Sequence, residues 1–311
     1  MKYVKVAFIG AGKIIREHIK AFSSIKNVEL AGLYSRTFDK AKRLSQEFKI
    51  EHVCSSIEDL FNKTKSDLVV IGVPIESTKK VCLESIKFPW KCLVEKPLGL
   101  NLKETIEIKR NFNSNKIYLA LNRNYLNSTL QVKKLLKNDS SKRIIFLFDQ
   151  ENTVKAKLHH SKKVIDNYMF ANSIHIIDYC RIFARGKIKN IRSIFSLKKN
   201  NIRFFSKKII FSTGDIVIYS TAWNRPGPWS VDISTDKYFF NIKPLEKVYI
   251  RSFNKNQDFQ LSADNDDKKY KPGFKKQALE IIKLINKKKN IVPDINDAFY
   301  TSKLVQRLYK N

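Results

Sequence analysis

Short apolar runs alternate with amphipathic stretches over the first 121 residues. The runs are typical of buried strands, and the stretches between them repeat apolar residues at helical spacing. This alternation predicts a parallel sheet covered by helices on both faces, with ligands at the carboxyl ends of its strands. The expected strands are 4–9, 28–34, 68–73, 92–94 and 117–121, and the expected helices are 14–24, 38–48, 56–62, 77–87 and 102–112.

After residue 122 the pattern changes, and strand-like segments separated by turn signals dominate. They predict a large, mostly antiparallel open sheet in an α+β domain. We therefore expect two domains, a doubly wound dinucleotide-binding domain over residues 1–121 and a second domain over 122–311. The expected strands are 144–148, 188–197, 208–211, 215–222, 229–233, 238–242 and 247–253, the expected helices about 170–183, 273–286 and 295–308, and the candidate disordered stretch is 254–271.

The first expected strand breaks into glycines directly before a helix. This arrangement brings bare backbone amides and a helix N-terminus to a diphosphate, and its context makes the short motif informative. The third glycine of the usual fingerprint is Ile15 here, which predicts looser packing of helix against strand rather than loss of the diphosphate contact. The expected contacts are Gly10, Ala11, Gly12, Lys13 and Ile14.

The choice between NAD and NADP is expected at the end of the second strand, where an acidic residue would bind the ribose hydroxyls of NAD. This chain has Ser35, Arg36 and Thr37 there instead. Hydroxyls and a guanidinium suit a 2′-phosphate, so NADP is favoured. The alternative is that Arg36 stacks on the adenine and either cofactor binds.

Composition bears on the number of domains, the binding partners and the cellular compartment of the protein. The 311 residues, 43% of them apolar, are enough for about two domains with a sizeable core. The net charge of +31 is scattered along the chain, which favours a solvated basic exterior that attracts anionic ligands over a nucleic-acid site. Four irregularly spaced cysteines, and no signal peptide or membrane-length apolar run, indicate a cytoplasmic protein without a zinc site or disulfides.

A second motif, Val-Glu-Lys-Pro-Leu-Gly over residues 94–99, makes a family resemblance specific. Together with the glycine turn and the apolar strand that ends at Pro74, it resembles the Gfo/Idh/MocA family of NAD(P)-dependent oxidoreductases, over essentially the whole chain. The resemblance implies action on sugars, inositols and related polyols, and a closing helix, about 295–309, that returns to the first domain. It also places Val73, Pro74, Glu95 and Lys96 at the cofactor.

Hydride transfer at a secondary alcohol also needs a proton to move at oxygen, so a polar acid/base group must lie near the nicotinamide. The ammonium of Lys96 suits this task, and the resemblance implies that it contacts the substrate hydroxyl. Glu95 is expected to be structural, and Pro97 to fix the turn, with a cis peptide bond as one option.

The expected helix over 170–183 carries a polar stripe of Asn172, His175 and Asp178 among apolar residues. An isolated histidine of this kind is more often a satisfied core residue, here paired with Asp178. The resemblance reverses that preference. It makes His175 an acid/base residue, Asp178 a substrate or orienting residue, and Asn172 a substrate contact.

The resemblance has one notable departure. Many family members carry an aspartate four residues before this histidine, where the chain has Ala171. Either Lys96 and His175 suffice, or Tyr168 or Asp166 substitutes, or the usual redox activity is lost.

Further contacts and partners follow from the position of segments and from the resemblance. Arg123 and Tyr125, just past the last strand of the first domain, are expected either to contact substrate or to pack at the hinge. The resemblance implies a homodimer or homotetramer. The predicted function is hydride transfer between nicotinamide and a hydroxyl or keto carbon of a sugar, cyclitol or nucleotide-sugar; the alternative is a non-catalytic dinucleotide-binding sensor or scaffold.

Overall fold

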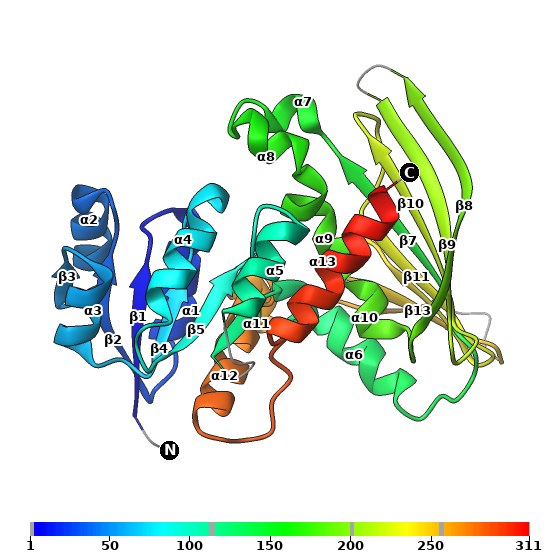
Figure 1. Ribbon diagram of the computed structural model, residues 1–311. Coiled ribbons are helices and arrows are strands. Elements are labelled where there is room, and N and C mark those ends of the chain that lie inside the picture. Colours follow the sequence, from blue (N-terminus) through cyan, green and yellow to red (C-terminus); the bar gives the residue numbers. More distant parts are fainter. Residues whose placement is uncertain (1–2, 112–115, 200–201, 255–257, 311) are drawn as a thin grey trace. The chain divides into compact units, whose positions relative to one another are not determined.

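The chain forms two compact units in the computed structural model, which describes residues 3–111, 116–199, 202–254 and 258–310 (Figure 1). Unit 1 contains residues 1–122 and 268–300, and unit 2 contains residues 123–267 and 301–311. The division near residue 122 lies beside the expected domain boundary. The expected second domain is nevertheless shared between the units, because residues 268–300 group with unit 1.

Unit 1 is built on a six-stranded parallel sheet in the order β3-β2-β1-β4-β5-β6. The order reverses between β1 and β4, so the carboxyl ends of β1, β4 and β5 lie along one edge of the sheet. The expected doubly wound fold is confirmed. The strands are β1 (Val4–Ile9), β2 (Val28–Tyr34), β3 (His52–Cys54), β4 (Leu68–Ile71), β5 (Lys91–Glu95) and β6 (Ile117–Ala120).

Two apolar cores cover the faces of this sheet. Alternate residues of β1 point to opposite faces, so that Val6 and Phe8 join one core while Ala7 and Ile9 join the other. Helices α1 (Lys13–Ser23), α2 (Phe38–Phe48) and α12 (Phe274–Ile285) pack on the first face. The second face is covered by α3 (Ile57–Thr64), α4 (Ile75–Ser85), α5 (Leu102–Arg110) and the first residues of α13 (Ile295–Tyr309). The end of the expected helix 102–112 lies outside the described residues.

Unit 2 contains an eight-stranded sheet in the order β14-β13-β12-β11-β7-β10-β9-β8. Neighbouring strands are antiparallel except β7 and β10, so the expected mostly antiparallel sheet is confirmed. The strands are β7 (Ile144–Glu151), β8 (Ile188–Lys199), β9 (Ile202–Phe211), β10 (Ile216–Trp223), β11 (Ser230–Ser234), β12 (Tyr238–Ile242), β13 (Val248–Ser252) and β14 (Asp258–Leu261).

The expected continuous helix over 170–183 is wrong, because the segment is divided into three short pieces. A π-helical turn, η2 (Met169–Ser173), leads into α9 (Ile174–Ile177) and then α10 (Tyr179–Phe183). Each π turn holds an extra residue, so η2 changes which side chains share a face with His175. Figure 1 shows these helices on one side of the large sheet, with α6 (Asn127–Leu136), while α7 (Thr153–Ala156) and α8 (Lys162–Asp166) lie beyond the end of β7.

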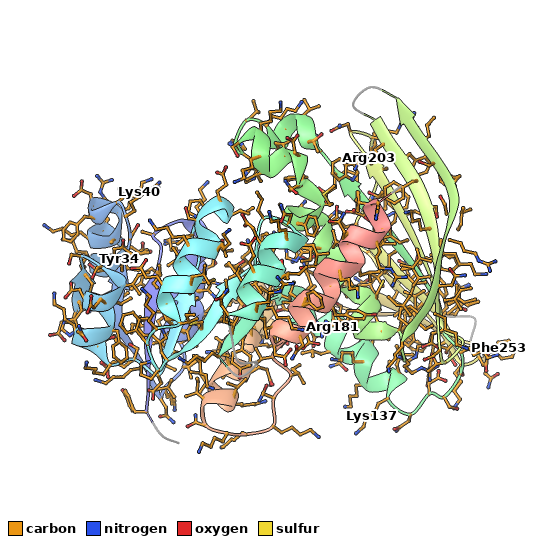
Figure 2. All side chains as sticks on the ribbon, in the orientation of Figure 1. Tyr34, Lys40, Lys137, Arg181, Arg203 and Phe253 are labelled. Carbon is orange, nitrogen blue, oxygen red and sulfur yellow. The ribbon has the colours of Figure 1, made fainter. Side chains whose placement is uncertain are left out.

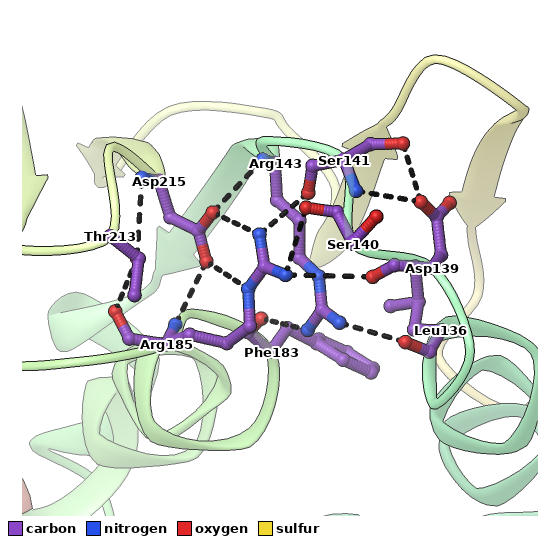
Figure 3. Close-up of polar contacts among 9 residues, drawn as sticks. All are labelled: Leu136, Asp139, Ser140, Ser141, Arg143, Phe183, Arg185, Thr213 and Asp215. Atoms are coloured by element: carbon purple, nitrogen blue, oxygen red, sulfur yellow. Dashed lines mark hydrogen bonds and ion pairs between the residues drawn. The ribbon is translucent and has the colours of Figure 1, made fainter.

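A buried carboxylate ties the start of β7 to the loop before β10 in unit 2 (Figure 3). The Arg185 guanidinium donates two hydrogen bonds to Asp215, at 3.0 and 2.7 Å, and the Arg143 backbone amide donates a third. Burial by itself would raise the pKa of Asp215, but these hydrogen bonds outweigh it and hold that pKa below its usual range. Arg143 in turn donates to the Phe183 and Leu136 carbonyls, which fixes the end of α10 and of α6.

Many of the basic residues lie on the outside of the two units. Lys40 on α2 and Lys137 after α6 are exposed, and Figure 2 shows their side chains pointing away from the elements that carry them. The expected disorder over 254–271 is wrong for the described part, which contains β14 and the helix α11 (Asn265–Lys269); residues 255–257 lie outside it.

Candidate active site

The turn after β1 accepts only glycine at its first position. Gly10 has a φ of +112°, and a Cβ atom there would lie 2.2 Å from the carbonyl oxygen of Gly72. Its backbone amide donates a 2.7 Å hydrogen bond to the Tyr34 carbonyl at the end of β2. The turn is therefore held tightly between β1, β2 and the residue after β4.

Gly12 leads directly into α1 and borders open space. A Cβ atom on Gly12 would meet nothing within 4 Å, and no side chain caps the first turn of the helix. The first amides of α1 are thus left for a ligand or water, and the helix dipole favours a negative group there. This cradle fits a dinucleotide diphosphate, and Ala11, Lys13 and Ile14 beside it are at least partly exposed.

Ile15, which replaces the third glycine of the usual fingerprint, is fully buried. Space for its side chain comes from Gly72, where a Cβ atom would lie 2.6 Å from Ile15 Cδ1. The larger residue on the helix is thus matched by a glycine after β4, and α1 stays in the core.

The residues expected to select the cofactor follow β2. Arg36 and Thr37 are exposed, Ser35 is partly buried, and the Thr37 amide donates to Ser35 Oγ at 3.4 Å. Val73 and Pro74 follow β4 at the same edge of the sheet and are also accessible. These positions suit contact with a ligand that begins at the glycine turn.

Glu95 ends β5 and is hydrogen-bonded to a histidine that the sequence analysis did not single out. His18 Nε2 lies 2.7 Å from Glu95 Oε1, and 1% of the His18 side chain is exposed. The sequence carries a signal for this pair, because the spacing of His18 with Ile15, Ile19 and Phe22 places it on the buried face of α1. A buried polar side chain needs a hydrogen-bond partner. The pair fixes the end of β5, and Lys96 follows at once, partly buried and with a cis peptide bond to Pro97.

In unit 2, Asp178 is 1% exposed and is held entirely by protein groups. Asn124 donates to it at 2.8 Å, Arg181 at 2.9 and 2.8 Å, and Thr301 at 2.7 Å. These bonds hold the carboxylate between three segments of unit 2, which favours the orienting alternative for Asp178.

Arg123 and Tyr125 flank Asn124 along the chain. The Arg123 guanidinium is 3.6 Å from Glu246 and 5.9 Å from the ring centre of Trp229. Tyr125 is fully buried, which favours its packing alternative. Trp229 also contacts His175, with ring centres 5.9 Å apart, and His175 is 7% exposed.

A pocket of about 470 Å³ opens beside Trp229. Asn172, one of the expected substrate contacts, lines it and donates a 2.7 Å hydrogen bond to Glu151 Oε2. Ala171, where the family often has aspartate, is 5% exposed and carries no titratable group. The lining residues are Gln150, Glu151, Asn152, Lys155, Ala156, His159, His160, Tyr168, Asn172 and Trp229.

The sequence pattern does not point to several of these lining residues. It offers Tyr168 only as an alternative, and nothing in it brings His159, His160 and Trp229 together. Burial first, and then the nearby carboxyl groups of Glu151 and Asp149, raise the pKa of the Tyr168 hydroxyl. Asp166, the other alternative, ends α8 and is exposed.

Comparison with known proteins identifies the first part of the chain. The family model for the Gfo/Idh/MocA oxidoreductase family with an NAD-binding Rossmann fold matches residues 4–122. Residues 4–122 are thus similar to that family, as their motifs predict.

Individual curated relatives match only part of the chain. An L-aspartate dehydrogenase of Methanocaldococcus jannaschii is 35% identical over 85 residues, which are 27% of this chain and 31% of that protein. A glucose-6-phosphate 3-dehydrogenase of Bacillus subtilis is 27% identical over 160 residues, which are 51% of this chain and 42% of that protein. The chain thus matches less than half the length of each curated relative.

The fold is shared over the full length with solved structures. A dehydrogenase from Chromobacterium violaceum has a TM-score of 0.84 and 16% identity, over 99% of this chain and 94% of that one. No helix among the described residues is long and apolar enough to cross a membrane. In the same part of the chain, no three His, Cys, Asp or Glu side chains come together as a metal site would require.

Proposed function

We propose that the protein is an NAD(P)-dependent oxidoreductase that transfers hydride between nicotinamide and a hydroxyl or keto carbon of a sugar, cyclitol or nucleotide-sugar. One observation carries the proposal. Lys96 follows β5 at the edge of the sheet where β1 ends in the strained Gly10 turn, so one unit presents a diphosphate cradle and a partly buried cation together.

The residues that would hold the cofactor lie at or after the carboxyl ends of unit 1 strands. The nicotinamide ring, when bound, supplies or accepts the hydride. The chain's own part is to bind the diphosphate, select the ribose and position Lys96. These residues are Gly10, Ala11, Gly12, Lys13, Ile14, Ser35, Arg36, Thr37, Val73, Pro74, Glu95 and Lys96.

The remaining roles divide between proton transfer and orientation. Lys96 stabilises negative charge on the reacting oxygen, and His175 acts as acid and base. Asp178 orients its helix, Asn172 and Arg123 contact the substrate, and Tyr125 packs in the core of unit 2.

The charge of the chain supports an anionic substrate or cofactor. A net charge of +31 attracts phosphate-bearing molecules, and one relative is named for a sugar phosphate. We place the protein in the cytoplasm, with small molecules rather than nucleic acid as partners.

NADP is the favoured cofactor because Arg36 can pair with a 2′-phosphate. Arg36→Ala is expected to weaken NADP binding about tenfold, the loss of one charge-assisted hydrogen bond, while NAD binding changes little. Fluorescence titration with both reduced cofactors measures this. Lys40→Ala removes an exposed cation from α2, the helix that follows Arg36, and is the matched control. An equal effect of both variants, or an equal loss of NAD and NADP affinity, would contradict the assignment.

A homodimer or homotetramer is supported by the outer face of the unit 2 sheet. Ile144, Phe146 and Phe239 are 43, 44 and 42% exposed, and the register places Ile144 and Phe239 on the same face through Ser234. Phe146→Asp is therefore expected to shift the protein toward monomer in light scattering. Phe38→Asp, at an exposed aromatic of unit 1, serves as the control. A monomeric wild type would refute this point.

Mass spectrometry of the protein as purified is the first test of the cofactor. Co-purified NADP or NAD supports the proposal, and absence of binding to either at millimolar concentration contradicts it. Cofactor binding without turnover on sugars, cyclitols or nucleotide-sugars would instead support the alternative, a dinucleotide-binding sensor or scaffold.

A further inference from the structure

Two carboxylic acids are buried next to each other at the end of β7. Asp149 and Glu151 are two residues apart on one strand, so they share a face of the sheet, and they are 0 and 1% exposed. Asp149 Oδ2 accepts hydrogen bonds from Tyr219 at 2.6 Å and from Thr221 at 3.1 Å. Asp149 is thus bound as a carboxylate by hydroxyl groups from β10.

Glu151 is the member of the pair that reaches the pocket. Its Oε2 accepts from Asn172 at 2.7 Å and its Oε1 accepts from Ser173 at 3.2 Å, and Glu151 lines the pocket while Asp149 does not. Both donors come from the π-helical turn η2, which therefore holds the Glu151 carboxyl group in a fixed orientation.

Glu151 keeps its proton at neutral pH. Burial, followed by the charge of Asp149, raises the pKa of Glu151 from 4.5 to about 9, and the protonated carboxyl group donates a hydrogen bond to Asp149. Burial also raises the pKa of Asp149, and the hydroxyl donors reduce that rise without cancelling it. The pair therefore shares one proton, which resides on the residue that faces the pocket.

The pocket has the lining of a polyol site. Trp229 offers an apolar ring face, and its indole NH is already satisfied by the Gln150 carbonyl at 2.9 Å. Asn152, Lys155, His159 and His160 add polar groups around it. The titratable or charged groups that surround Glu151 or line the same pocket are Asp149 on β7, Lys155 on α7, His159 and His160 after α7, Tyr168 before η2, Tyr219 on β10 and Tyr309 on α13.

We propose that Glu151 is a catalytic acid and base of this pocket, exchanging a proton with the reacting oxygen of a polyol or ketose bound beside Trp229. The inference rests on the proposed function. With hydride supplied by a bound reduced cofactor, the carbonyl oxygen would gain its proton as the Glu151 O–H bond breaks. In the oxidising direction the alcohol O–H proton would pass to the Glu151 carboxylate, with the bound oxidised cofactor as the hydride acceptor. Glu151 thereby supplies the carboxylic acid that Ala171 does not.

Glu151→Gln keeps the shape of the group and its hydrogen bond to Asp149 but cannot give up a proton. Carbonyl reduction is expected to fall about 100-fold, with cofactor affinity unchanged. Wild-type reduction should be flat at neutral pH and decline as pH rises through about 9, where Glu151 ionises, and oxidation should rise over the same range. In the glutamine variant, neither the decline of reduction nor the rise of oxidation near pH 9 should remain. Asp258→Asn, which removes an exposed carboxylate paired with Arg251, should keep them.

A measurement without turnover tests the same protonation. The folded protein binds a proton at Glu151 that the unfolded chain releases above its ordinary pKa of 4.5, so thermal stability should decline between that pH and about 9. In Glu151→Gln this component of the slope should vanish and stability above pH 7 should rise. A residue that only supports the fold through hydrogen bonds would leave the variant less stable.

The outcomes separate the inference from the proposed function. The probes are myo-inositol, glucose 6-phosphate and a UDP-sugar, each with NAD and NADP, together with the corresponding ketones for reduction. An inactive wild type overturns both proposals. An active wild type with an equally active glutamine variant and an unchanged pH profile overturns only the role of Glu151. The role of Glu151 is supported if the glutamine variant is slower, if its rates no longer change near pH 9, and if its thermal stability no longer declines with pH below that value.

Discussion

Replacing Lys96 by alanine is expected to lower turnover by about 100-fold or more while NADP still binds, and His175→Ala is expected to do the same. Both residues are assigned to proton movement and charge stabilisation at the reacting oxygen, whereas the diphosphate is held by the Gly10 turn and the first amides of α1. Steady-state rates and fluorescence titration of the cofactor separate the two effects. The loss should appear mainly in kcat rather than in cofactor affinity.

Lys91→Ala is the matched control for Lys96. It removes a partly buried lysine from the same strand, β5, at the end opposite to the glycine turn. Its turnover should remain within about twofold of wild type, as expected for a residue away from the chemistry. If Lys96→Ala and His175→Ala both retain full activity, the proposed mechanism is wrong.

Gly10→Ala is expected to destabilise unit 1 by about 3 kcal/mol and to abolish cofactor binding. The backbone of Gly10 has a φ of +112°, and the added methyl group would lie 2.2 Å from the Gly72 carbonyl oxygen. Since the neighbouring atom belongs to the backbone, it cannot move aside cheaply. Chemical denaturation monitored by circular dichroism measures the stability loss.

Gly12→Ala provides the contrast within the same turn. A Cβ atom at Gly12 meets nothing within 4 Å, and its φ of −87° is ordinary for alanine. The fold should therefore keep its stability while the new methyl group weakens diphosphate binding. Equal stability of the Gly10 and Gly12 variants would contradict the account of the turn.

The sequence predicts unit 1 well because its strands are buried on both faces and read as continuous apolar runs. Unit 2 is less regular. Short helices such as α7 and α8 have too few residues for a clear periodicity, and the π turn η2 interrupts a pattern that otherwise fits a single helix. The polar stretch before α12 lacks apolar periodicity, yet it contains β14 and α11.

The sequence predicts the local motifs of the site, but it does not predict which residues far apart in the chain form hydrogen bonds. The Gly10 turn and Lys96 belong to short contiguous patterns with a mechanical reason for each residue. His18 and Glu95 are 77 positions apart, and Glu151 and Asn172 are 21 apart, so neither hydrogen bond follows from spacing. The raised pKa of Glu151 depends on burial beside Asp149, which appears only when β7 is packed against β10 and η2.

Nicotinamide absorbance at 340 nm is the direct readout of the central claim, since reduced nicotinamide absorbs there and the oxidised ring does not. Purified protein with NADP or NAD is mixed with a panel of sugars, cyclitols, sugar phosphates and nucleotide-sugars. The account predicts a substrate-dependent change that Lys96→Ala abolishes and Lys91→Ala preserves. No change with any member of the panel in either direction, from protein shown to bind the cofactor, would contradict it.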